Sequence, residues 1–528
     1  MARLRAPTAS GDVLLEPASG QVAVARANET ALSAATLWGR PLSERRSAAR
    51  AEVLALATRY SSALLPSAPQ PSTNNSQPFP PQPLWFVGGH QPELYHPGVW
   101  AKSAAIHELA EQDGGVALNL TVDNDLCPGA VVSVPSGPDR VGLTNLEWDQ
   151  PQPQSPWEER PAPDPSRFGS FGDRCQQHLR PWGIEPLAAA QDWSGATELN
   201  LIDRLVRLRA QFERQAGLSN LELRVSQLAE TDCFQQFVAD LIQHAEPFAQ
   251  TYNLALTQYR QLHHVRSESH PVPALAVDAR GTELPLWVWR TGETRRRPLF
   301  VRAGTLHDGL REIGPLSTAR QNGWKIRPRA LSLTLFCRLL LGSAFVHGIG
   351  GALYDQVTNS IMQSLLGIDP PAMIVATATL RLFESFAGAD PHAAVARKEH
   401  DRRALRWNPE LLFEQLATTD HFDERLVLEL IAHKQLLVDE INAAKRATDP
   451  NAKRHEQAAS RHARVQGLNE RLRMHLPAEL DESMAAELAA LHQQSPHWDN
   501  LRSREYASNL FPASQIQELF RTVRRQIS

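Results

Sequence analysis

The sequence predicts an α/β fold: a Rossmann-like core with a parallel sheet, a helical insertion, and a C-terminal helical coiled-coil hairpin. Three observations predict it. The apolar runs LWFVGG (84–89) and VALNLTVDND (116–125) are typical of buried strands, and helical periodicity from Val99 to Glu111 joins them. Such a strand–helix–strand unit normally places its two strands parallel in one sheet. Near the C-terminus, apolar residues recur with four-and-three spacing, which indicates a helical hairpin.

Composition limits the class of protein before any motif is considered. A chain of 528 residues with 42% hydrophobic content can bury a large core and is long enough for more than one domain. Its 54 basic and 58 acidic residues give a net charge of -4, which argues against nucleic acid or an anionic membrane as a partner. The four cysteines form no CxxC pair, so we expect a reducing compartment and no structural zinc. Without a signal-peptide pattern or a membrane-spanning run, we expect a cytoplasmic protein.

The first elements follow from apolar spacing and from proline. Helical periodicity from Pro41 to Leu65 predicts a helix, and the run from Pro66 to Pro83 can be neither helix nor central strand. The first strand, helix and second strand of the core follow. The proline-rich segment QPQPQSPWEERPAPDP (150–165) marks the start of an insertion, and helical spacing from Leu199 to about Gln250 predicts that this insertion is helical.

The second half of the core is expected from strand-like runs at 284–304 and 373–380, which we predict rejoin the sheet. Between them we expect an apolar helix, a glycine-rich turn and another helix. The predicted boundaries are 1–145 (N-terminal helix and first part of the core), 146–270 (mainly helical insertion), 271–420 (second part of the core), 421–476 (helical hairpin) and 477–528 (C-terminal helical segment).

The hairpin has a narrow apolar seam. The seam positions on its first helix are Leu426, Leu430, Leu437, Ile441 and Ala444. Pro450 breaks the pattern, and it resumes at Val465, Leu468 and Leu472. The returning helix begins with mainly alanine, so we expect part of the seam to stay uncovered unless a second copy of the chain, forming a homodimer, or the parent core packs on it.

The stretch FVGGHQPELYHPGVWAK (86–102) is the first candidate site. Two glycines end the first strand, and the helix that follows offers free backbone amides to an anion. Histidines and a lysine beside such a helix start suit a phosphate or carboxylate group. The alternative is a proline-shaped turn with solvated histidines, because the stretch matches neither of the usual glycine-rich phosphate motifs. The candidate residues are Gly88, Gly89, His90, Gln91, His96, Gly98 and Lys102.

The second strand ends in three polar residues, Asp123, Asn124 and Asp125. At that edge of the sheet the carboxylates could orient an amine or hydroxyl, hold a divalent cation, or cap the next segment. His90 and His96 could join them around zinc or iron, but the spacing lacks the usual helical metal pattern, and we predict no metal site.

The third candidate is RPRAL (327–331) and the turn that follows its helix. A guanidinium there could clamp a carboxylate or phosphate, and the glycine-rich turn could face the same ligand. The alternative, a glycine cap followed by an acidic helix start, explains only Gly348 and Asp355. The candidate residues are Arg327, Arg329, His347, Gly348, Gly350, Gly351, Tyr354 and Asp355.

In their order along the chain, three segments resemble the cysteine-adding enzymes of bacillithiol biosynthesis. They are VGGHQPELYHPGVWAKSAAIHELA, VALNLTVDND and RPRALSLTLFCRLLLGSAFVHGIGG. The resemblance implies a Rossmann-like core related to nucleotidyltransferases, a connective insertion, a dimerising C-terminal coiled coil, and the joining of cysteine to a glucosaminyl malate.

The chain departs from the family pattern at three places. His90 and Gln91 replace a double glutamine, His96, Pro97 and Gly98 replace a threonine-glycine-proline element, and GIGG replaces a glycine-proline-glycine-glutamate turn. The His96 turn is also similar to the HIGH element of class I nucleotidyltransferases and synthetases, which stabilises the phosphates of ATP.

These patterns favour a ligase- or transferase-like enzyme that condenses an amine- or thiol-bearing metabolite with a sugar or carboxylate substrate. Its catalytic candidates are His90, His96, Asp123 and Asp125, and its candidate cofactor is a nucleotide such as ATP or ADP. The alternatives are a non-catalytic nucleotide- or metabolite-binding protein and a metal-dependent glycosyltransferase. In each case we expect residues 88–98, 123–125 and 347–355 to converge on one cleft.

Overall fold

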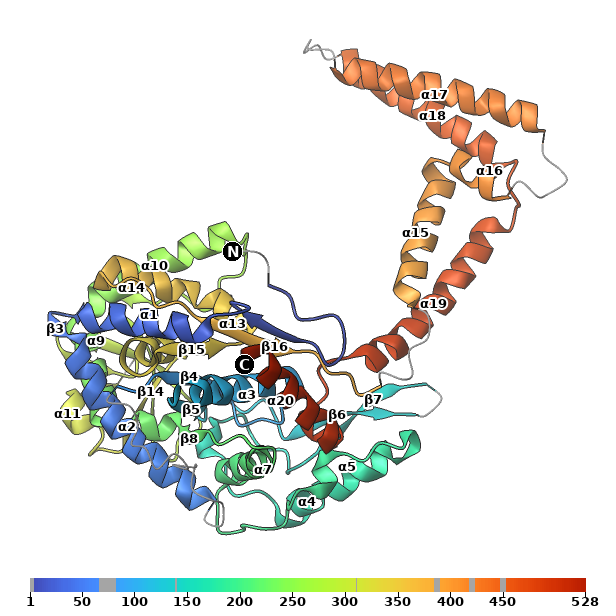
Figure 1. The fold of residues 1–528 in the computed structure, drawn as a ribbon. Coiled ribbons are helices and arrows are strands. Elements are labelled where there is room, and N and C mark those ends of the chain that lie inside the picture. Colours follow the sequence, from blue (N-terminus) through green and yellow to red (C-terminus); the bar gives the residue numbers. More distant parts are fainter. Residues whose placement is uncertain are drawn as a thin grey trace. The chain divides into compact units, whose positions relative to one another are not determined.

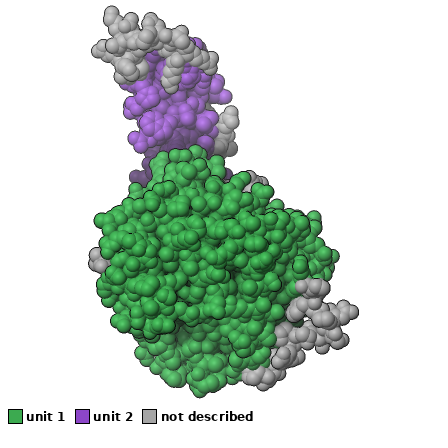
Figure 2. All heavy atoms as spheres, turned by 90° about the vertical axis from the view of Figure 1, so that its left-hand side faces the viewer, with its two compact units in different colours: residues 1–138, 143–382, 503–528 green, residues 139–142, 383–502 purple. Residues whose placement is uncertain are grey.

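The computed structural model describes residues 4–65, 82–137, 140–309, 311–383, 390–416, 423–446 and 453–528. Apart from its last two positions, the proline-rich run 66–83 lies outside the described residues. The chain forms two compact units (Figure 2). Unit 1 comprises residues 1–138, 143–382 and 503–528, and unit 2 comprises 139–142 and 383–502.

The described strands follow one another along the chain as shown in Figure 1. They are β1 (Val13–Glu16), β2 (Thr36–Leu37), β3 (Arg40–Pro41), β4 (Trp85–His90), β5 (Val116–Thr121), β6 (Val131–Ser136), β7 (Gly142–Glu147), β8 (Leu221–Arg224), β9 (Val277–Asp278), β10 (Gly281–Arg290), β11 (Arg297–Arg302), β12 (Thr305–His307), β13 (Glu312–Gly314), β14 (Trp324–Pro328), β15 (Ala344–His347) and β16 (Ile374–Ala378).

The described α-helices of unit 1 are α1 (Gln21–Ala34), α2 (Leu42–Leu64), α3 (Pro97–Asp113), α4 (Pro165–Gly169), α5 (Phe171–Leu179), α6 (Leu187–Ala190), α7 (Leu201–Gln215), α8 (Val225–Leu228), α9 (Asp232–Gln243), α10 (Ala245–Leu262), α11 (Leu316–Ala319), α12 (Ala330–Phe336), α13 (Ile349–Tyr354), α14 (Gln356–Leu366) and α20 (Ala513–Ile527). Those of unit 2 are α15 (Pro391–Trp407), α16 (Glu410–Leu416), α17 (Glu424–Arg446), α18 (Lys453–Arg473) and α19 (Leu480–Arg502).

The main sheet of unit 1 has the strand order β1-β16-β15-β4-β5-β8. Strands β16, β15, β4, β5 and β8 pair parallel to their neighbours, and only the edge strand β1 pairs antiparallel. From β4 the chain first adds β5 and β8 on one side, then returns to add β15 and β16 on the other. The strands predicted at 84–89 and 116–125 are therefore confirmed as parallel neighbours, although the second ends at Thr121, and the direction of winding reverses between β4 and β15.

Both faces of this sheet are covered because its strands are apolar on both faces. On one face, Trp85, Val87 and Leu118 belong to the large core together with side chains of α2 and α9. On the other face lies α3, and a Cβ at Gly88 would be only 3.3 Å from Ile106 of that helix. Glycine at position 88 thus allows α3 to pack close to β4.

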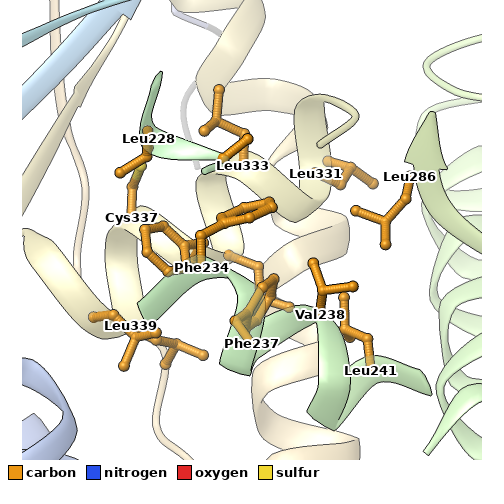
Figure 3. Close-up of a cluster of buried hydrophobic side chains, with 14 of the residues drawn as sticks. Leu228, Phe234, Phe237, Val238, Leu241, Leu286, Leu331, Leu333, Cys337 and Leu339 are labelled. Carbon is orange, nitrogen blue, oxygen red and sulfur yellow. The ribbon is translucent and has the colours of Figure 1, made fainter. Parts of the chain in front are cut away.

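The expectation that residues 284–304 rejoin the main sheet is wrong. Strands β10 and β11 belong to a second, antiparallel sheet with the order β13-β12-β11-β10-β14. Only residues 291–296 connect them, which suits a hairpin, whereas parallel neighbours need a long crossover. Near α9 and α12, apolar side chains of this second sheet join the large core; Figure 3 shows Leu286 facing Leu331 and Val238.

Three strands of the main sheet were not expected, the edge strand β1 and the parallel strands β15 and β8. Strand β15 lies in the segment predicted to be a helix before the glycine-rich turn, because the apolar run ends its helix in a π-helical turn at Cys337–Leu341 and then becomes extended. Strand β8 lies within the segment 146–270, which the sequence analysis treats as mainly helical, and pairs with β5. The predicted strand at 373–380 is confirmed as β16 beside β15.

Unit 2 is helical, and α17 packs beside α18. Leu430 and Leu437 of α17 are 3% and 2% exposed, in a cluster that also contains Leu405 of α15, Leu412 of α16 and Leu472 of α18. At Leu430 and Leu437 the seam is therefore covered within the chain, because α15 and α16 supply apolar surface in addition to α18, while Leu426 and Ile441 stay half-buried. The predicted break at Pro450 and the side chain of Ala444 lie outside the described residues. Among the described helices, none combines the length and the apolar character that a membrane crossing needs.

Candidate functional site

The candidate site lies at the carboxyl edge of the main sheet, where the winding reverses between β4 and β15. His90 is the last residue of β4, and His347 is the last residue of β15. Because Phe345 pairs with Val87 in parallel register, His347 lies level with Gly89. Ligands of parallel α/β sheets bind at this kind of reversal, outside the carboxyl ends of the strands.

The N-terminus of α3 reaches the same edge. His96 is its N-cap, and its Nδ1 accepts a hydrogen bond from the Gly98 backbone N–H at 3.1 Å. The proton of the neutral imidazole is therefore on Nε2, which lies 3.8 Å from Glu505 Oε2. Gly98 is required by close packing, because a Cβ there would be 2.5 Å from the Ala378 carbonyl oxygen at the end of β16.

Lys102 lies one turn into α3 and is the central cation of this edge. Its Nζ donates a hydrogen bond to the Gly89 carbonyl oxygen at 2.9 Å, and within the described part of the chain it forms no ion pair. Burial lowers the pKa of Lys102 to about 8, so the ammonium is charged at neutral pH without a carboxylate to compensate it.

The positive charge of Lys102 contributes to the pKa values of three nearby histidines, His90, His96 and His347. Burial lowers the pKa of His90 to about 3, and the positive charge of Lys102 contributes to that lowering. Burial also lowers the pKa of His96 and of His347, with Lys102 again a smaller cause in each. The first and third predicted clusters are thus brought together around one lysine, as expected, and their imidazoles are neutral at pH 7.

His347 is held by a buried carboxylate. Its Nε2 lies 3.2 Å from Asp355 Oδ2, and the same carboxylate accepts hydrogen bonds from Arg338 at 2.7 Å and Thr334 at 2.6 Å. Burial opposes ionisation of Asp355, but Arg338 and His347 outweigh it and hold the pKa of this carboxyl well below its usual range. Asp355 is therefore a fixed acceptor for an N–H of the imidazole.

The three polar residues that follow β5 differ in role: Asp123 and Asn124 make structural hydrogen bonds, and Asp125 does not share their surroundings. Asp123 is fully buried, and its two oxygens accept from Arg224, from the Ser226 hydroxyl and from the Ser226 backbone N–H at 2.5–2.8 Å. It caps α8 and has no oxygen left for a ligand, so its predicted catalytic role finds no support. Asn124 likewise donates to the Pro328 carbonyl oxygen at 2.7 Å.

Asp125, in contrast, has a side chain that is 41% exposed. Its carboxylate accepts from Gln91 Nε2 at 2.9 Å and pairs with Arg296 at 3.0 Å. Its negative charge reaches Tyr354, whose pKa rises to about 12 through burial first and then through Asp355 and Asp125. Residues 88–98, 125 and 347–355 therefore lie at one edge of the sheet, whereas a single cleft that all of them line stays a prediction.

The two predicted arginine clamps are already occupied. Arg327 pairs with Glu158 at 2.8 Å and with Glu230 at 2.7 Å, and Arg329 pairs with Glu283 at 2.6 Å while its guanidinium stacks 4.1 Å from the Trp287 ring centre. Arg327 thus connects β14 of the second sheet to Glu158 and Glu230, and Arg329 connects the start of α12 to β10. Sequence alone shows that an arginine precedes a helix but not which carboxylates, more than forty positions away, neutralise it.

A pocket extends from this edge beneath α3, between β4, β5 and α7. Besides Gly88 to Tyr95 and Lys102 it is lined by Asn119, Thr121, Arg209 and Asn509. At its floor Arg209 pairs with Glu213 at 2.8 Å and with Glu222 at 2.6 Å. Burial first, and then the nearby Glu213, raise the pKa of Glu222 to about 7 despite Arg209. The sequence did not predict this cluster, because Arg209 and Glu213 have the pattern of an ordinary polar helix face and Glu222 lies in a short strand.

The arrangement suits the binding of an anion and the transfer of a proton. Within the described residues, no three His, Cys, Asp or Glu side chains gather closely enough to hold a metal ion. No protein-family model matches the chain, and comparison with curated proteins gives no significant match.

Proposed function

We propose that the carboxyl edge of the sheet at β4 and β15 binds the phosphate or carboxylate group of a small molecule, and that the chain is a ligase- or transferase-like enzyme. The observation that carries this proposal is Lys102, an ammonium without an ion-pair partner among the described residues, at the winding reversal and one turn into α3. An uncompensated buried cation there would gain a charge-assisted contact from an anionic ligand.

The strand order supports a Rossmann-like interpretation of unit 1. If the parallel strands are numbered along the chain from β4, their order across the sheet is 3-2-1-4-5, which is the order of dinucleotide-binding sheets. A nucleotide such as ATP or ADP is therefore the candidate cofactor. The resemblance to the cysteine-adding enzymes agrees with this choice and suggests a thiol- or amine-bearing second substrate.

The alternatives differ in what they require of the site. A metal-dependent glycosyltransferase would need Asp123 and Asp125 on one cation, and Asp123 is engaged with Arg224 and Ser226. A binding protein without turnover would use the same site as the enzyme. Turnover of ATP in the presence of cysteine and amino sugars separates the enzyme from the binding protein.

Calorimetric titration with ATP, ADP and pyrophosphate tests the anion site. Lys102→Met and His96→Ala should each weaken binding about tenfold or more, because charge-assisted hydrogen bonds contribute roughly 1.5 to 3 kcal/mol. The control is Lys398→Met in unit 2, whose ammonium already pairs with Glu487 at 2.6 Å. Equal affinities for the wild type and the Lys102 and His96 variants would contradict the proposal.

A further inference from the structure

The glycine-rich turn after β15 places two residues against opposite nitrogens of one histidine. Gly351 and Asp355 are four positions apart, and the Asp355 backbone N–H donates to the Gly351 carbonyl oxygen at 3.0 Å. Asp355 lies at Nε2 of His347, at 3.2 Å. Gly351 lies at Nδ1, since a Cβ added there would be 2.8 Å from that nitrogen.

The Asp355 carboxylate sets the tautomer of His347. An ionised carboxylate only accepts hydrogen bonds, so Nε2 must carry the proton and Nδ1 must carry a lone pair. Among the described residues, Nδ1 has no hydrogen-bond partner. The cations Arg338 and Lys102 add to burial in keeping the pKa of the imidazole low, against Asp355, so the ring is neutral at pH 7.

Gly351 is not required by its backbone. Its φ lies outside the left-handed region that favours glycine, as do those of Gly348 and Gly350. The three differ in their surroundings: a Cβ at 348 or 350 would meet nothing within 4 Å, whereas a Cβ at 351 would press on Nδ1. The absent side chain at 351 therefore leaves room beside Nδ1 of an imidazole that is only 4% exposed as a whole.

We propose that His347 is a catalytic general base, whose Nδ1 takes a proton from a nucleophilic N–H, O–H or S–H group of a substrate anchored at Lys102. Asp355 is its positioning residue. In this step the bond from hydrogen to the nucleophile breaks, its electron pair stays on the nucleophile, and an Nδ1–H bond forms. The imidazolium then faces the Asp355 carboxylate through Nε2–H. The inference rests on the proposed anion site and assigns it a base.

Acylation by diethyl pyrocarbonate probes Nδ1 without knowledge of the natural substrate. This reagent transfers its ethoxycarbonyl group to an unprotonated imidazole nitrogen and releases carbon dioxide and ethanol. Modification of His347 is followed by peptide mass spectrometry at pH 7, with the exposed His264 as the internal reference. The wild type and Gly350→Ala should react equally at His347, and Gly351→Ala should lose that reaction while circular dichroism shows that it remains folded. An unreactive His347 in the wild type, or equal reaction in Gly351→Ala, would overturn the proposal.

Two further measurements keep the test decisive if Gly351→Ala does not fold. Nitrogen-15 spectra of the wild type should show His347 protonated on Nε2 and not on Nδ1; the opposite tautomer overturns the role of Asp355. Saturating pyrophosphate should slow acylation of His347 but not of His264. If pyrophosphate binds tightly but does not protect His347 from acylation, the general-base proposal is wrong and the proposed anion site is retained. If pyrophosphate does not bind, the proposed anion site is wrong.

Discussion

A buried lysine titrates differently from a surface lysine, and Lys102 has a consequence for the pH range of ligand binding. Its ammonium stands on α3 beside neutral His90 and His96, and burial lowers its pKa from 10.5 to about 8. A lowered pKa means that this cation is present below pH 8 and is lost as the pH rises through 8. The anion site should therefore weaken at a pH where an exposed lysine would still be fully charged.

We predict that pyrophosphate affinity falls about tenfold between pH 7 and pH 9, since one proton is bound with the anion over that interval. Lys102→Arg should retain its affinity at pH 9, because a guanidinium stays charged there. Titration calorimetry at both pH values measures the change. An affinity that stays constant up to pH 10 would show that Lys102 does not contact the anion.

At the scale of elements, one carboxylate ties α1 and α2 to the segment that precedes β15. Glu29 of α1 pairs with Arg46 at 2.6 Å and with Arg50 at 2.8 Å, both on α2, and accepts from Ser343 at 2.7 Å. Arg46 also donates to the Leu339 carbonyl oxygen at 2.6 Å. Burial raises the pKa of Glu29, but the hydrogen bond from Arg50 and the two positive charges outweigh it and lower this pKa to about 2.

We predict that Glu29→Gln lowers the free energy of unfolding by about 3 to 5 kcal/mol at pH 7, because it leaves the buried Arg46 without its charge partner. The folded-state pKa of about 2 lies below the ordinary 4.5, so this carboxylate stabilises the fold above pH 4.5. The contribution, about 3 kcal/mol, is lost as the pH falls from 4.5 towards 2.

Urea unfolding at pH 7 and at pH 3.5 measures both effects. The difference between the wild type and Glu29→Gln should narrow at the lower pH. Glu44→Gln is the matched control, because Glu44 is exposed in the first turn of α2 and should change stability by less than about 1 kcal/mol. A difference that does not depend on pH would contradict the low pKa of Glu29.

The sequence predicts an element well when the residues that mark it are close together in the chain, and poorly when its structure depends on distant residues. Strands β4 and β5 are short apolar runs and α3 between them has helical periodicity, and this order predicts a parallel pair. Strand β15 has only three apolar residues and His347, and two residues separate it from an apolar helix, so the apolar pattern alone does not show where the helix ends and the strand begins. The predicted catalytic role of Asp123 is not supported for a related reason. The residues that donate hydrogen bonds to its carboxylate, Arg224 and Ser226, come about a hundred positions later in the sequence.

At the scale of the whole molecule, unit 2 is stabilised by its own apolar cluster. We predict that Leu437→Glu unfolds this unit, because it places a charge at a position that is 2% exposed. Leu436→Glu is the matched control on the same helix, at a position that is 65% exposed, and should keep the fold. Circular dichroism and limited proteolysis between residues 390 and 502 compare the two. Equal resistance to protease in both variants would contradict the packing of α17.

The homodimer stays a prediction, and its surface has to be redefined. Leu430 and Leu437 are covered within the chain, so any contact with a second copy through α17 would use its outer face, where Leu428 and Leu436 are 59% and 65% exposed. Light scattering at micromolar concentration should find a dimer for the wild type and a monomer for the double variant with glutamate at both outer positions. A monomeric wild type would exclude the dimer.

Unit 2 interrupts unit 1 in the sequence, and this has a consequence for biosynthesis. Residues 503–528 follow unit 2 but belong to unit 1, where α20 packs on α3 and Arg524 pairs with Glu108 at 3.0 Å. On the ribosome, the segment with His96 and Lys102 emerges long before Glu505 and α20, which complete its surroundings. The surroundings of the proposed anion site can therefore be complete only after all of unit 2 has been translated, so a nascent chain should acquire the proposed ligand binding late.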